Sequence, residues 1–574
     1  MKTGSDYLAD QLFKYGVRVA FVFTGGAISA IIDAVHRRGI KIVPYDHELD
    51  ASYAAEGYVR ATLSPAVVLV TSGPGATNTI TGIAGSWFDS IPVLFISGQV
   101  KSHEKTNFDL NLQNGFQETD VIKSTSHFTK YSKTIDNCSQ IIPVVREAFK
   151  LMLSGRPGPA VLDITMDAQA ELMQNPGLKK LVYLDFKESL KKGLLSNDKL
   201  SLRKDYEKFL DLIQASKKPV ILIGGGLQWL EKDLVNKVIN KIKAKVVSTY
   251  AGINAINFEN LFYDGMIGPF GHPLANKTLI EASDLFIIGA RIPQRALPIL
   301  KKSSKAKLLS IKKYVLTVDP SEFINHRIGP IEKIFYGLSY NFFQYVDKKL
   351  VSSSKKNIKK IHSNIFLPKD MFVSIPSKSD SSLTIKNQHS VRKFIESLNL
   401  TLPFNANIFV DVGQNAVALA LGLKRTRGEK LYSSWANSPM GYSLPASLGA
   451  ALGHENRKSI CIIGDGGLRT ALCSLPNLRL MKGKVKIILW DNQGYRTIVD
   501  HVEKMLAGRR QGVTEQSGVP SFPLDKVLVS SGLDVLHAKK NLENDMRLFF
   551  NDKKFDVLIV SIDHSIRMVP NKFI

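Results

Sequence analysis

The sequence predicts an α/β fold made of three doubly wound parallel-sheet domains. Short apolar, strand-like runs alternate with helix-like segments along almost the whole chain, which is the pattern of parallel α/β layers. The chain has 574 residues, too many for one hydrophobic core. Two irregular stretches, near 176–200 and at 347–385, interrupt the alternation and read as linkers. We therefore expect domains at 1–175, 195–346 and 386–574, with 347–385 as a linker.

Each expected domain contains recognisable elements. In the first, residues 6–15 form an amphipathic helix pattern, and 67–70, 93–96 and 160–164 are strand-like. In the second, the run 219–226 is a strand that ends in three glycines, and 285–289 is a further strand. The third contains the apolar runs 460–463 and 485–490. The first and third domains are similar in size and in their alternation of strand-like and helix-like segments, but the sequence shows no tandem repeat.

The polar turns after 460–463 and 485–490 contain the most informative residues. Asp465 offers a carboxylate and Asn492 an amide oxygen, and neighbouring glycines allow close backbone approach. The carboxyl ends of neighbouring parallel strands are where such sheets hold ligands. Hard oxygen ligands of this kind suit Mg²⁺ shared with phosphate groups. The alternative is a pair of ordinary glycine-bearing turns.

Composition narrows the functional classes. The net charge is +25, but the lysines are scattered, and no basic motif interleaved with aromatic residues occurs, so we expect no nucleic-acid partner. No apolar run approaches the roughly 20 residues that a membrane helix needs, and the N-terminus has no signal-like apolar region. Three cysteines cannot make a disulfide framework, so we expect a cytoplasmic protein.

The two polar turns resemble the metal motif of thiamine-diphosphate enzymes, a Gly-Asp-Gly followed by a later pair of asparagines. Asn492 follows Asp465 by 27 residues (492 − 465). The resemblance implies that Asp465, Asn492 and the carbonyl of Gly494 bind Mg²⁺, which in turn binds the cofactor's diphosphate. Asp491 occupies the position of the family's first asparagine, and it adds negative charge near the site.

A wider resemblance covers most of the chain. The sequence is similar to the large subunits of acetolactate synthase (acetohydroxyacid synthase), and most similar to variants associated with surface-sugar pathways. That last similarity rests on 88–92, 166–169 and 508–509. The segments that match the wider group, in the family's order, are 47–48, 54–60, 71–78, 115–119, 155–159, 413–415 and 440–446.

The resemblance implies roles for individual residues. Glu48 would hydrogen-bond the pyrimidine ring of thiamine diphosphate, although a glutamate at a strand-to-helix junction is commonly a helix-end charge. Met440 would support the thiazolium ring, or else simply fill the core. Gln414 and Asn415 would bind the diphosphate. The other cofactor-binding positions implied are Asn78, Gly413, Gly464, Gly466, Gly467 and Tyr495.

Two further groups of residues follow from the resemblance. Phe116, Gln117, Gly25 and Gly26 would line the reaction pocket, with ordinary turn or core material as the alternative. Two arginines would serve the second substrate or a flavin. Arg295 would bind the acceptor's carboxylate, and Arg291 would contact flavin adenine dinucleotide (FAD), a cofactor that the resemblance allows. Both arginines could equally be ordinary surface residues.

The implied activity is a carboligation. A 2-keto acid, with pyruvate as the default, would lose carbon dioxide, and its acyl unit would pass to a carbonyl acceptor. The acceptor would be a second 2-keto acid or a keto-sugar nucleotide, because the family's tryptophan falls on Val502. Decarboxylation without ligation and a non-catalytic scaffold remain alternatives.

The family geometry implies a homodimer or homotetramer. The family's Gln-Glu-Leu becomes 473–475, which puts helix packing near the metal in doubt.

Overall fold

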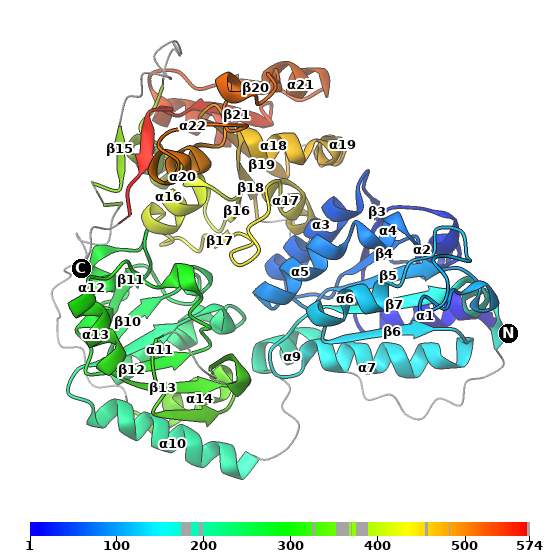
Figure 1. The fold of residues 1–574 in the computed structure, drawn as a ribbon, viewed down its shortest axis with the longest axis horizontal. Helices are drawn as coiled ribbons and strands as arrows, with labels where there is room; N and C mark the ends of the chain where they lie inside the picture. Colours follow the sequence, from blue (N-terminus) through cyan, green and yellow to red (C-terminus); the bar gives the residue numbers. More distant parts are fainter. Residues whose placement is uncertain are drawn as a thin grey trace. The chain divides into compact units, whose positions relative to one another are not determined.

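The computed structural model describes residues 1–173, 185–193, 199–323, 328–351, 367–368, 370–374, 388–453, 457–481 and 483–570. It contains three six-stranded parallel sheets, which confirms the predicted fold class (Figure 1). The chain divides into two compact units. The first comprises Met1–Leu194, Ala436–Ser459 and Thr470–Val485, and the second comprises Leu195–Trp435, Ile460–Arg469 and Lys486–Ile574.

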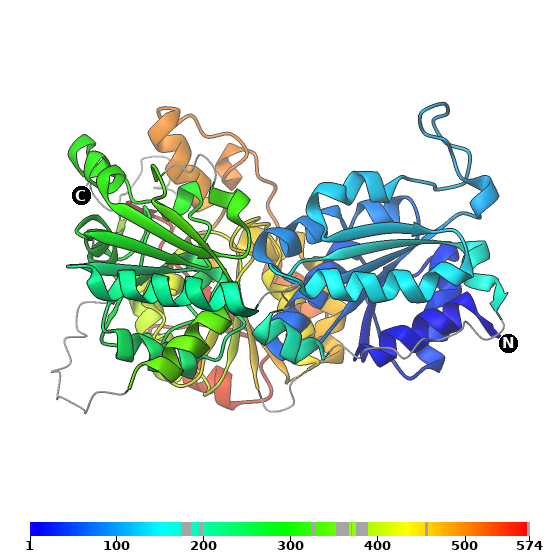
Figure 2. The ribbon, with the colours of Figure 1, turned by 90° about the horizontal axis from the view of Figure 1, so that it is seen from below.

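The first sheet lies in the first unit and has the strand order β3-β2-β4-β5-β7-β6. Strands β4 and β7 are buried along their whole length, as expected when helices cover both faces of a parallel sheet (Figure 2). Helices α1, α2 and α7 pack together, as do α3 and α5. The strands are β2 (Val19–Val22), β3 (Lys41–Pro44), β4 (Val67–Val70), β5 (Leu94–Gln99), β6 (Tyr131–Ile135) and β7 (Ala160–Thr165). The helices are α1 (Gly4–Lys14), α2 (Ser29–Arg37), α3 (Glu48–Thr62), α4 (Pro74–Thr77), α5 (Ile80–Asp89), α6 (Val121–Thr125), α7 (Ile141–Leu153) and α8 (Met166–Ala170).

Helix α17 (Ser443–Ala451), far along the sequence, packs against α3 within the same unit. Two glycines make this close packing possible. A Cβ at Gly57 would lie 2.0 Å from the carbonyl oxygen of Ala446, and one at Gly449 would lie 1.9 Å from that of Ala54. The segments 54–60 and 440–446, both noted in the sequence, therefore meet in one helix–helix contact. Helix α19 (Leu475–Leu480) belongs to this unit too.

The central sheet has the order β11-β10-β9-β12-β13-β14. The glycine turn after β9 packs on the loop after β12, since a Cβ at Gly224 would lie 2.4 Å from Cα of Ala290. The strands are β9 (Pro219–Ile223), β10 (Lys245–Ser248), β11 (Tyr263–Met266), β12 (Asp284–Ile288), β13 (Lys312–Thr317) and β14 (Lys333–Tyr336). The helices are α10 (Lys199–Ala215), α11 (Lys232–Ile242), α12 (Pro273–Ile280), α13 (Lys302–Ser310) and α14 (Ser339–Lys349).

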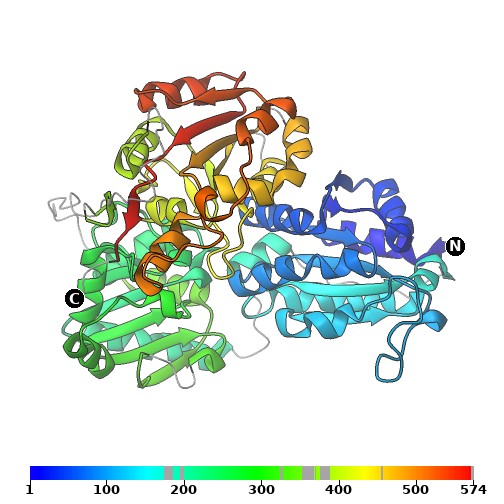
Figure 3. The same cartoon turned by 45° about the horizontal axis from the view of Figure 1, so that its top comes forward.

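The third sheet has the order β17-β16-β18-β19-β21-β20. A separate two-stranded antiparallel sheet pairs β15 (Phe372–Ser374) with β22 (Ile566–Met568), the red strand in Figure 3. The sheet strands are β16 (Asn407–Val410), β17 (Lys430–Tyr432), β18 (Ser459–Gly464), β19 (Val485–Asp491), β20 (Val535–His537) and β21 (Val557–Ser561). Its helices are α15 (Val391–Thr401), α16 (Gln414–Gly422), α18 (Asp465–Thr470), α20 (Arg496–Met505), α21 (Leu524–Ser530) and α22 (Leu542–Asn551).

Strand order shows where ligands can bind. Numbered from its own first strand, the first sheet reads 2-1-3-4-6-5, and the third sheet reads the same. The central sheet reads 3-2-1-4-5-6. In the first and third sheets the order reverses between β2 and β4, and between β16 and β18. Crevices at the carboxyl ends of such strand pairs are the usual ligand sites of open α/β sheets.

The sequence predicted two irregular linkers, and the structure describes part of each. The stretch 176–200, expected to be irregular, contains helix α9 (Phe186–Lys192). Its N-terminus is capped by the Asp185 side chain, which accepts a hydrogen bond from Glu188 N. Phe186 and Leu190 are buried and hold the helix in place. Their helical spacing was missed because most of the surrounding residues are charged or polar. Most of the predicted linker 347–385 lies outside the described residues. No helix among the described residues is long and apolar enough to span a membrane.

The α3–α17 contact gives a stability prediction. Gly449→Ala should lower the melting temperature, because the added methyl group would meet backbone atoms that cannot rotate away. Overpacking of this kind typically costs about 1–3 kcal/mol. Differential scanning fluorimetry of the purified variant would measure the change. A melting temperature equal to or above that of the unaltered protein would contradict the close packing, since alanine otherwise favours a helix over glycine.

Candidate functional site

Three oxygen atoms converge where β18 and β19 end. Asp465 is the first residue of α18, and the turn after β19 brings Gly494 N to 2.6 Å from Asp465 Oδ2. The turn depends on positive φ angles at Gln493 (57°) and Gly494 (113°). Asn492 Oδ1 then lies 3.2 Å from the carbonyl oxygen of Gly494 and 3.3 Å from Asp465 Oδ1. With the Asn492 amide in this orientation, no N–H group lies between the three oxygens.

This arrangement fits a hard cation. Octahedral Mg²⁺ with bonds of about 2.1 Å holds neighbouring ligand oxygens roughly 3.0 Å apart, close to the separations found here. The three oxygens come from a carboxylate, an amide and a backbone carbonyl. Among the described residues no group of three or more His, Cys, Asp or Glu side chains could hold a metal ion. This site has only one such side chain among its three candidate ligands.

The orientation of the Asn492 amide supports the same conclusion. Its Nδ2 donates to Gln414 Oε1 at 3.1 Å, which leaves Oδ1 facing the other two oxygens. Exchanging the two amide atoms would let Nδ2 donate to Gly494 and Asp465. It would also set Asn492 Oδ1 against Gln414 Oε1 at the same 3.1 Å, oxygen against oxygen. The orientation with Oδ1 in the cluster avoids that repulsion.

Burial raises the pKa of Asp465 to about 7, and the nearby charge of Asp491 adds to the rise. The pKa of Asp491 is raised by its own burial, which a hydrogen bond from Gln493 N and the charge of Arg496 oppose. Two half-buried carboxyl groups close together are unfavourable in a protein without a counter-charge. A divalent cation would supply that counter-charge and favour the ionised form of Asp465.

The end of β16 forms a second part of the site. Gly413 has φ 126°, and α16 begins at Gln414. Asn415 is buried, and its Oδ1 accepts a hydrogen bond from Ala416 N at 2.9 Å. Its Nδ2 has no hydrogen-bond acceptor among the described residues, so a buried donor is available for a ligand such as a phosphate oxygen.

The glycines at the end of β18 differ in the space around them. A Cβ at Gly467 would lie 2.0 Å from Asp411 Oδ2, so a larger residue there would displace that side chain. A Cβ at Gly464 would enter open space, and Gly466 is buried. Tyr495 follows the turn after β19, and its N–H donates to the carbonyl of Val513 at 2.9 Å. The predicted positions at or just after the carboxyl ends of β16, β18 and β19 are Gly413, Gln414, Asn415, Gly464, Asp465, Gly466, Gly467, Asn492, Gly494 and Tyr495.

Glu48 occupies the corresponding edge of the first sheet. It is the first residue of α3 and only 4% exposed. Its Oε2 accepts a hydrogen bond from Asn78 Nδ2 at 3.0 Å, while Oε1 lies 3.6 Å from the point that a Cβ on Gly75 would occupy. His47 caps the helix, its Nδ1 accepting from Leu49 N. A solvated helix-end charge would not be buried in this way, so this alternative for Glu48 is disfavoured.

The loops around Glu48 approach one another closely. A Cβ at Gly25 would lie 2.5 Å from Thr71 Cβ, and one at Gly73 would lie 2.5 Å from the carbonyl oxygen of Gln117. Gln117 itself has φ 57°, whereas Gly26 faces open space. Gly25 and Gln117 therefore lie at the edge where β2 and β4 end. Phe116 does not join them, because its side chain is 85% exposed.

Sequence reasoning missed several residues that hold this region. Glu118 is buried and accepts hydrogen bonds from Thr106 N at 2.6 Å and Gly115 N at 3.1 Å, which fixes the turn that presents Gln117. Ser474 donates to Asp50 Oδ2 at 2.6 Å, so the unusual 473–475 segment packs on α3. Burial raises the pKa of Asp50 to about 6, which the Ser474 hydrogen bond opposes.

A buried ionic network also escaped the sequence reasoning. Arg60 lies 2.7 Å from Glu56 Oε1 and 2.6 Å from Asp89 Oδ2, and Tyr442 OH donates to Glu56 at 2.9 Å. Asp89 Oδ1 also accepts from Ala436 N at 3.2 Å, on the segment that leads to half-buried Met440. The i, i+4 spacing of Glu56 and Arg60 was the only signal in the sequence.

The two arginines predicted for an acceptor or a flavin lie on the loop after β12. Arg291 is half-buried and Arg295 is exposed. Between them, Ile292 has φ 45°. Burial raises the pKa of Tyr250, and the charge of Arg295 opposes that rise, so the two side chains are near each other.

The sequence matches known proteins along most of its length. Residues 2–124 match the N-terminal TPP binding domain of thiamine pyrophosphate enzymes, 206–328 match their central domain, and 411–560 match their C-terminal TPP binding domain. The acetolactate synthase large subunit of Cyanidium caldarium is 31% identical, over 86% of this chain and 82% of its own length. That of Lactococcus lactis subsp. lactis (strain IL1403) is 28% identical, over 99% of this chain and 94% of its own length.

A solved structure shares the fold. The thiamine diphosphate-dependent 4-hydroxybenzoylformate decarboxylase of Rhodococcus jostii RHA1 superposes with a TM-score of 0.77. It covers 98% of this chain and 99% of its own, at 15% sequence identity, which supports the fold alone. The family matches, together with the oxygen cluster and the buried acid, lead to one conclusion. The chain is an enzyme of the thiamine pyrophosphate (thiamine diphosphate) family, related within it to acetolactate synthase large subunits.

Proposed function

We propose that the protein is a thiamine diphosphate- and Mg²⁺-dependent carboligase. It decarboxylates pyruvate or a related 2-keto acid and transfers the acyl unit to a carbonyl acceptor. The observation that supports this most directly is the convergence of the Asp465, Asn492 and Gly494 oxygens. When bound, the cofactor would supply the electron sink for loss of carbon dioxide.

The chain's own residues would bind and orient the cofactor. Asp465, Asn492 and the Gly494 carbonyl would hold Mg²⁺, and the unused Nδ2 of Asn415 would donate to a diphosphate oxygen. Glu48 would exchange a proton with a pyrimidine nitrogen through Oε1, because Oε2 already accepts from Asn78. Asn78 would therefore orient the Glu48 carboxylate, in addition to any contact that it makes with the cofactor.

The acceptor is the least constrained part of the proposal. Arg295, exposed after β12, would bind an acceptor carboxylate, and Arg291 would contact FAD if a flavin is retained. Val502, buried on α20, has a smaller side chain than the tryptophan of the related enzymes. The smaller side chain favours a larger acceptor such as a keto-sugar nucleotide, as expected of variants associated with surface-sugar pathways.

With three free cysteines, we place this reaction in the cytoplasm.

Product analysis tests the reaction class. Purified protein would be incubated with pyruvate, thiamine diphosphate and Mg²⁺, and the products would be assayed before and after acid treatment. Acetoin that forms on acid treatment would identify 2-acetolactate and support ligation with pyruvate. Acetaldehyde alone would replace the proposal with simple decarboxylation. If pyruvate is consumed only when a keto-sugar nucleotide is added, the larger acceptor is supported.

A homodimer or homotetramer completes the proposal. The exposed loop 105–117 presents Leu110 (77% exposed), Leu112 (97%) and Phe116 (85%). Apolar side chains gathered on one exposed loop are typical of an interaction surface. A second copy of the chain would cover them and would bring Phe116 into a pocket, as the resemblance to acetolactate synthase implies.

Glu48→Gln should reduce turnover by at least ~100-fold, a typical contribution of general acid–base catalysis. Binding of thiamine diphosphate should remain close to that of the unaltered protein, because the amide keeps the shape and the hydrogen bond to Asn78. Steady-state kinetics and isothermal titration calorimetry would measure the two quantities. Glu147→Gln on α7, an exposed carboxylate in the same unit, is the matched control. Unchanged turnover in the Glu48 variant would remove this residue from the mechanism.

Cofactor affinity should depend on pH through Asp465. Its raised pKa of about 7 means that the empty site binds a proton below pH 7, and Mg²⁺ must displace that proton. The affinity for Mg²⁺ and thiamine diphosphate should therefore fall by up to about tenfold per pH unit below pH 7. Asp491→Asn removes the neighbouring charge, so the fall should begin at lower pH. Calorimetric titrations from pH 5.5 to 8 would show both effects; a pH-independent affinity would contradict the assignment.

Leu112→Asp should weaken self-association, because it places a charge within the exposed apolar loop. Sedimentation velocity across a dilution series would then show a larger monomer fraction than for the unaltered protein. Asn111→Asp adds the same charge at a neighbouring exposed position and serves as the control. If the unaltered protein is a monomer, or if both variants associate equally well, this loop is not the interface.

A further inference from the structure

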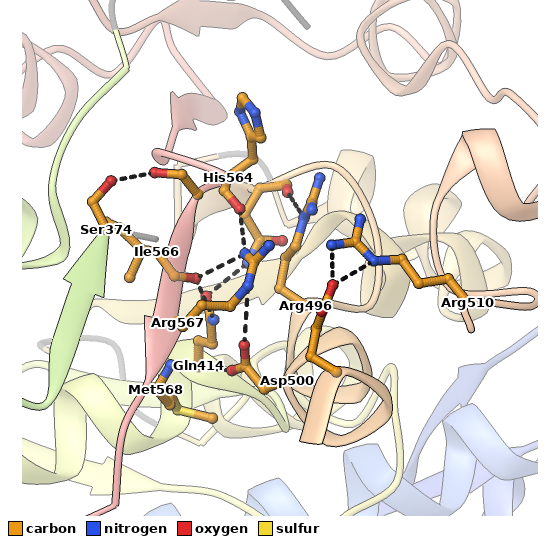
Figure 4. Close-up of polar contacts among 12 residues, drawn as sticks. Ser374, Gln414, Arg496, Asp500, Arg510, His564, Ile566, Arg567 and Met568 are labelled. Carbon is orange, nitrogen blue, oxygen red and sulfur yellow. Dashed lines mark hydrogen bonds and ion pairs between the residues drawn. The ribbon is translucent and has the colours of Figure 1, made fainter. Parts of the chain in front are cut away.

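The strand β22 makes polar contacts with Gln414 and Asp500 (Figure 4). Gln414 Nε2 donates to the carbonyl oxygen of Ile566 at 3.1 Å, and Met568 N donates to Asp500 Oδ2 at 3.1 Å. Arg567 Nε lies 3.5 Å from Asp500 Oδ1 and so keeps a cation beside that carboxylate. The strand is thus held to α16 by Gln414 and to α20 by Asp500.

These contacts fix which way the Gln414 amide points. Its Nε2 donates to the Ile566 carbonyl, and the Gln414 side chain also acts on the Asp500 carboxyl group, whose pKa it lowers. A carbonyl and a carboxylate can only accept hydrogen bonds, so only the NH₂ group of Gln414 can face them. The Oε1 atom must therefore face the opposite way, toward Asn492.

The orientation of Gln414 in turn decides that of Asn492. Because Gln414 presents an oxygen, Asn492 must present Nδ2 to it, and the two atoms are 3.1 Å apart. Asn492 Oδ1 is then left facing Asp465 and Gly494. Arg496 Nε donates to the backbone carbonyl of Asn492 at 2.8 Å, which fixes the backbone but not the amide. With the amide reversed, an NH₂ group would occupy the position of a metal ligand.

We propose that Asp500 and the Ile566 carbonyl act as positioning groups that, through Gln414, turn the oxygen of Asn492 toward the cation. The relay rests on the proposed function, because it presupposes that Asn492 is a Mg²⁺ ligand. Asp500 touches neither the cation nor the substrate. It acts by excluding the amide orientation that the cluster would otherwise adopt when no cation is present. The C-terminal strand is therefore part of the metal site although it supplies no ligand.

A double-mutant cycle tests the relay. Asp500→Asn replaces a group that only accepts with one that also donates, so only the Ile566 carbonyl still selects the NH₂ group of Gln414 and the reversed amide becomes more accessible. With Asn492 present, the Mg²⁺ affinity measured in the presence of thiamine diphosphate should fall about 10-fold or more, a typical effect of losing a group that orients a metal ligand. In an Asn492→Asp background both side-chain atoms are oxygens, so orientation no longer matters. There, Asp500→Asn should cost nothing, or should improve affinity by letting Gln414 turn its NH₂ group toward the new carboxylate.

Calorimetry on the four proteins gives the affinities without reliance on catalysis. Asp500→Glu keeps an acceptor-only group and should restore affinity to within about threefold. Glu503 lies on α20 like Asp500 and pairs with Arg510. The control variant Glu503→Gln should leave the Mg²⁺ affinity unchanged. An equal loss in both Asn492 backgrounds would show that Asp500 only holds the strand in place, and would overturn the relay while the proposed function stands. No Mg²⁺-dependent binding by the unaltered protein would overturn both.

Discussion

The candidate site depends on the hydrogen bond from Gly494 N to Asp465 Oδ2. It links the turn after β19 to the first residue of α18, so that oxygens from two neighbouring strands come within 3.3 Å of one another. The turn needs backbone angles that most residues avoid, and it leaves Asp465 half-buried near the charge of Asp491. Without a ligand this arrangement is strained and repulsive, which is the usual condition of a preorganised site.

The first and third sheets share a strand order, and each has a cluster of candidate residues at the carboxyl ends of its strands. In each sheet the order reverses between the first strand and the third, and the polar turns follow these strands or their neighbours. Glu48 and Gly25 lie at this edge of one sheet, and Gln414 and Asp465 at the same edge of the other. The central sheet has a different order and contributes neither group. Its candidate residues, Arg291 and Arg295, follow β12.

Buried polar groups, rather than apolar packing alone, fix the functional side chains. Arg60 lies between Glu56 and Asp89, so no member of that network is left as an isolated buried charge. Tyr442 joins it and ties the segment 436–442 to α3, the helix that begins with Glu48. Removing one partner from such a network is costly because the remaining charges stay buried. The same principle applies at Glu118, whose hydrogen bonds to backbone N–H groups shape the turn at Gln117.

The sequence alone determined the fold class, the main strands of each sheet and the polar turns that follow β18 and β19, because burial periodicity and glycine-bearing turns are local properties. It also pointed to Glu48, through the order of its segments. Tertiary structure decided the rest. It made a helix at 186–192, brought Ser474 to Asp50, left Phe116 exposed and set the strand order that the first and third sheets share. Only folding could orient the Asn492 amide, since the groups that orient it, Gln414 and Ile566, lie 78 residues before it and far along the chain after it. Hydrogen bonds between such distant residues leave no periodic pattern in a sequence.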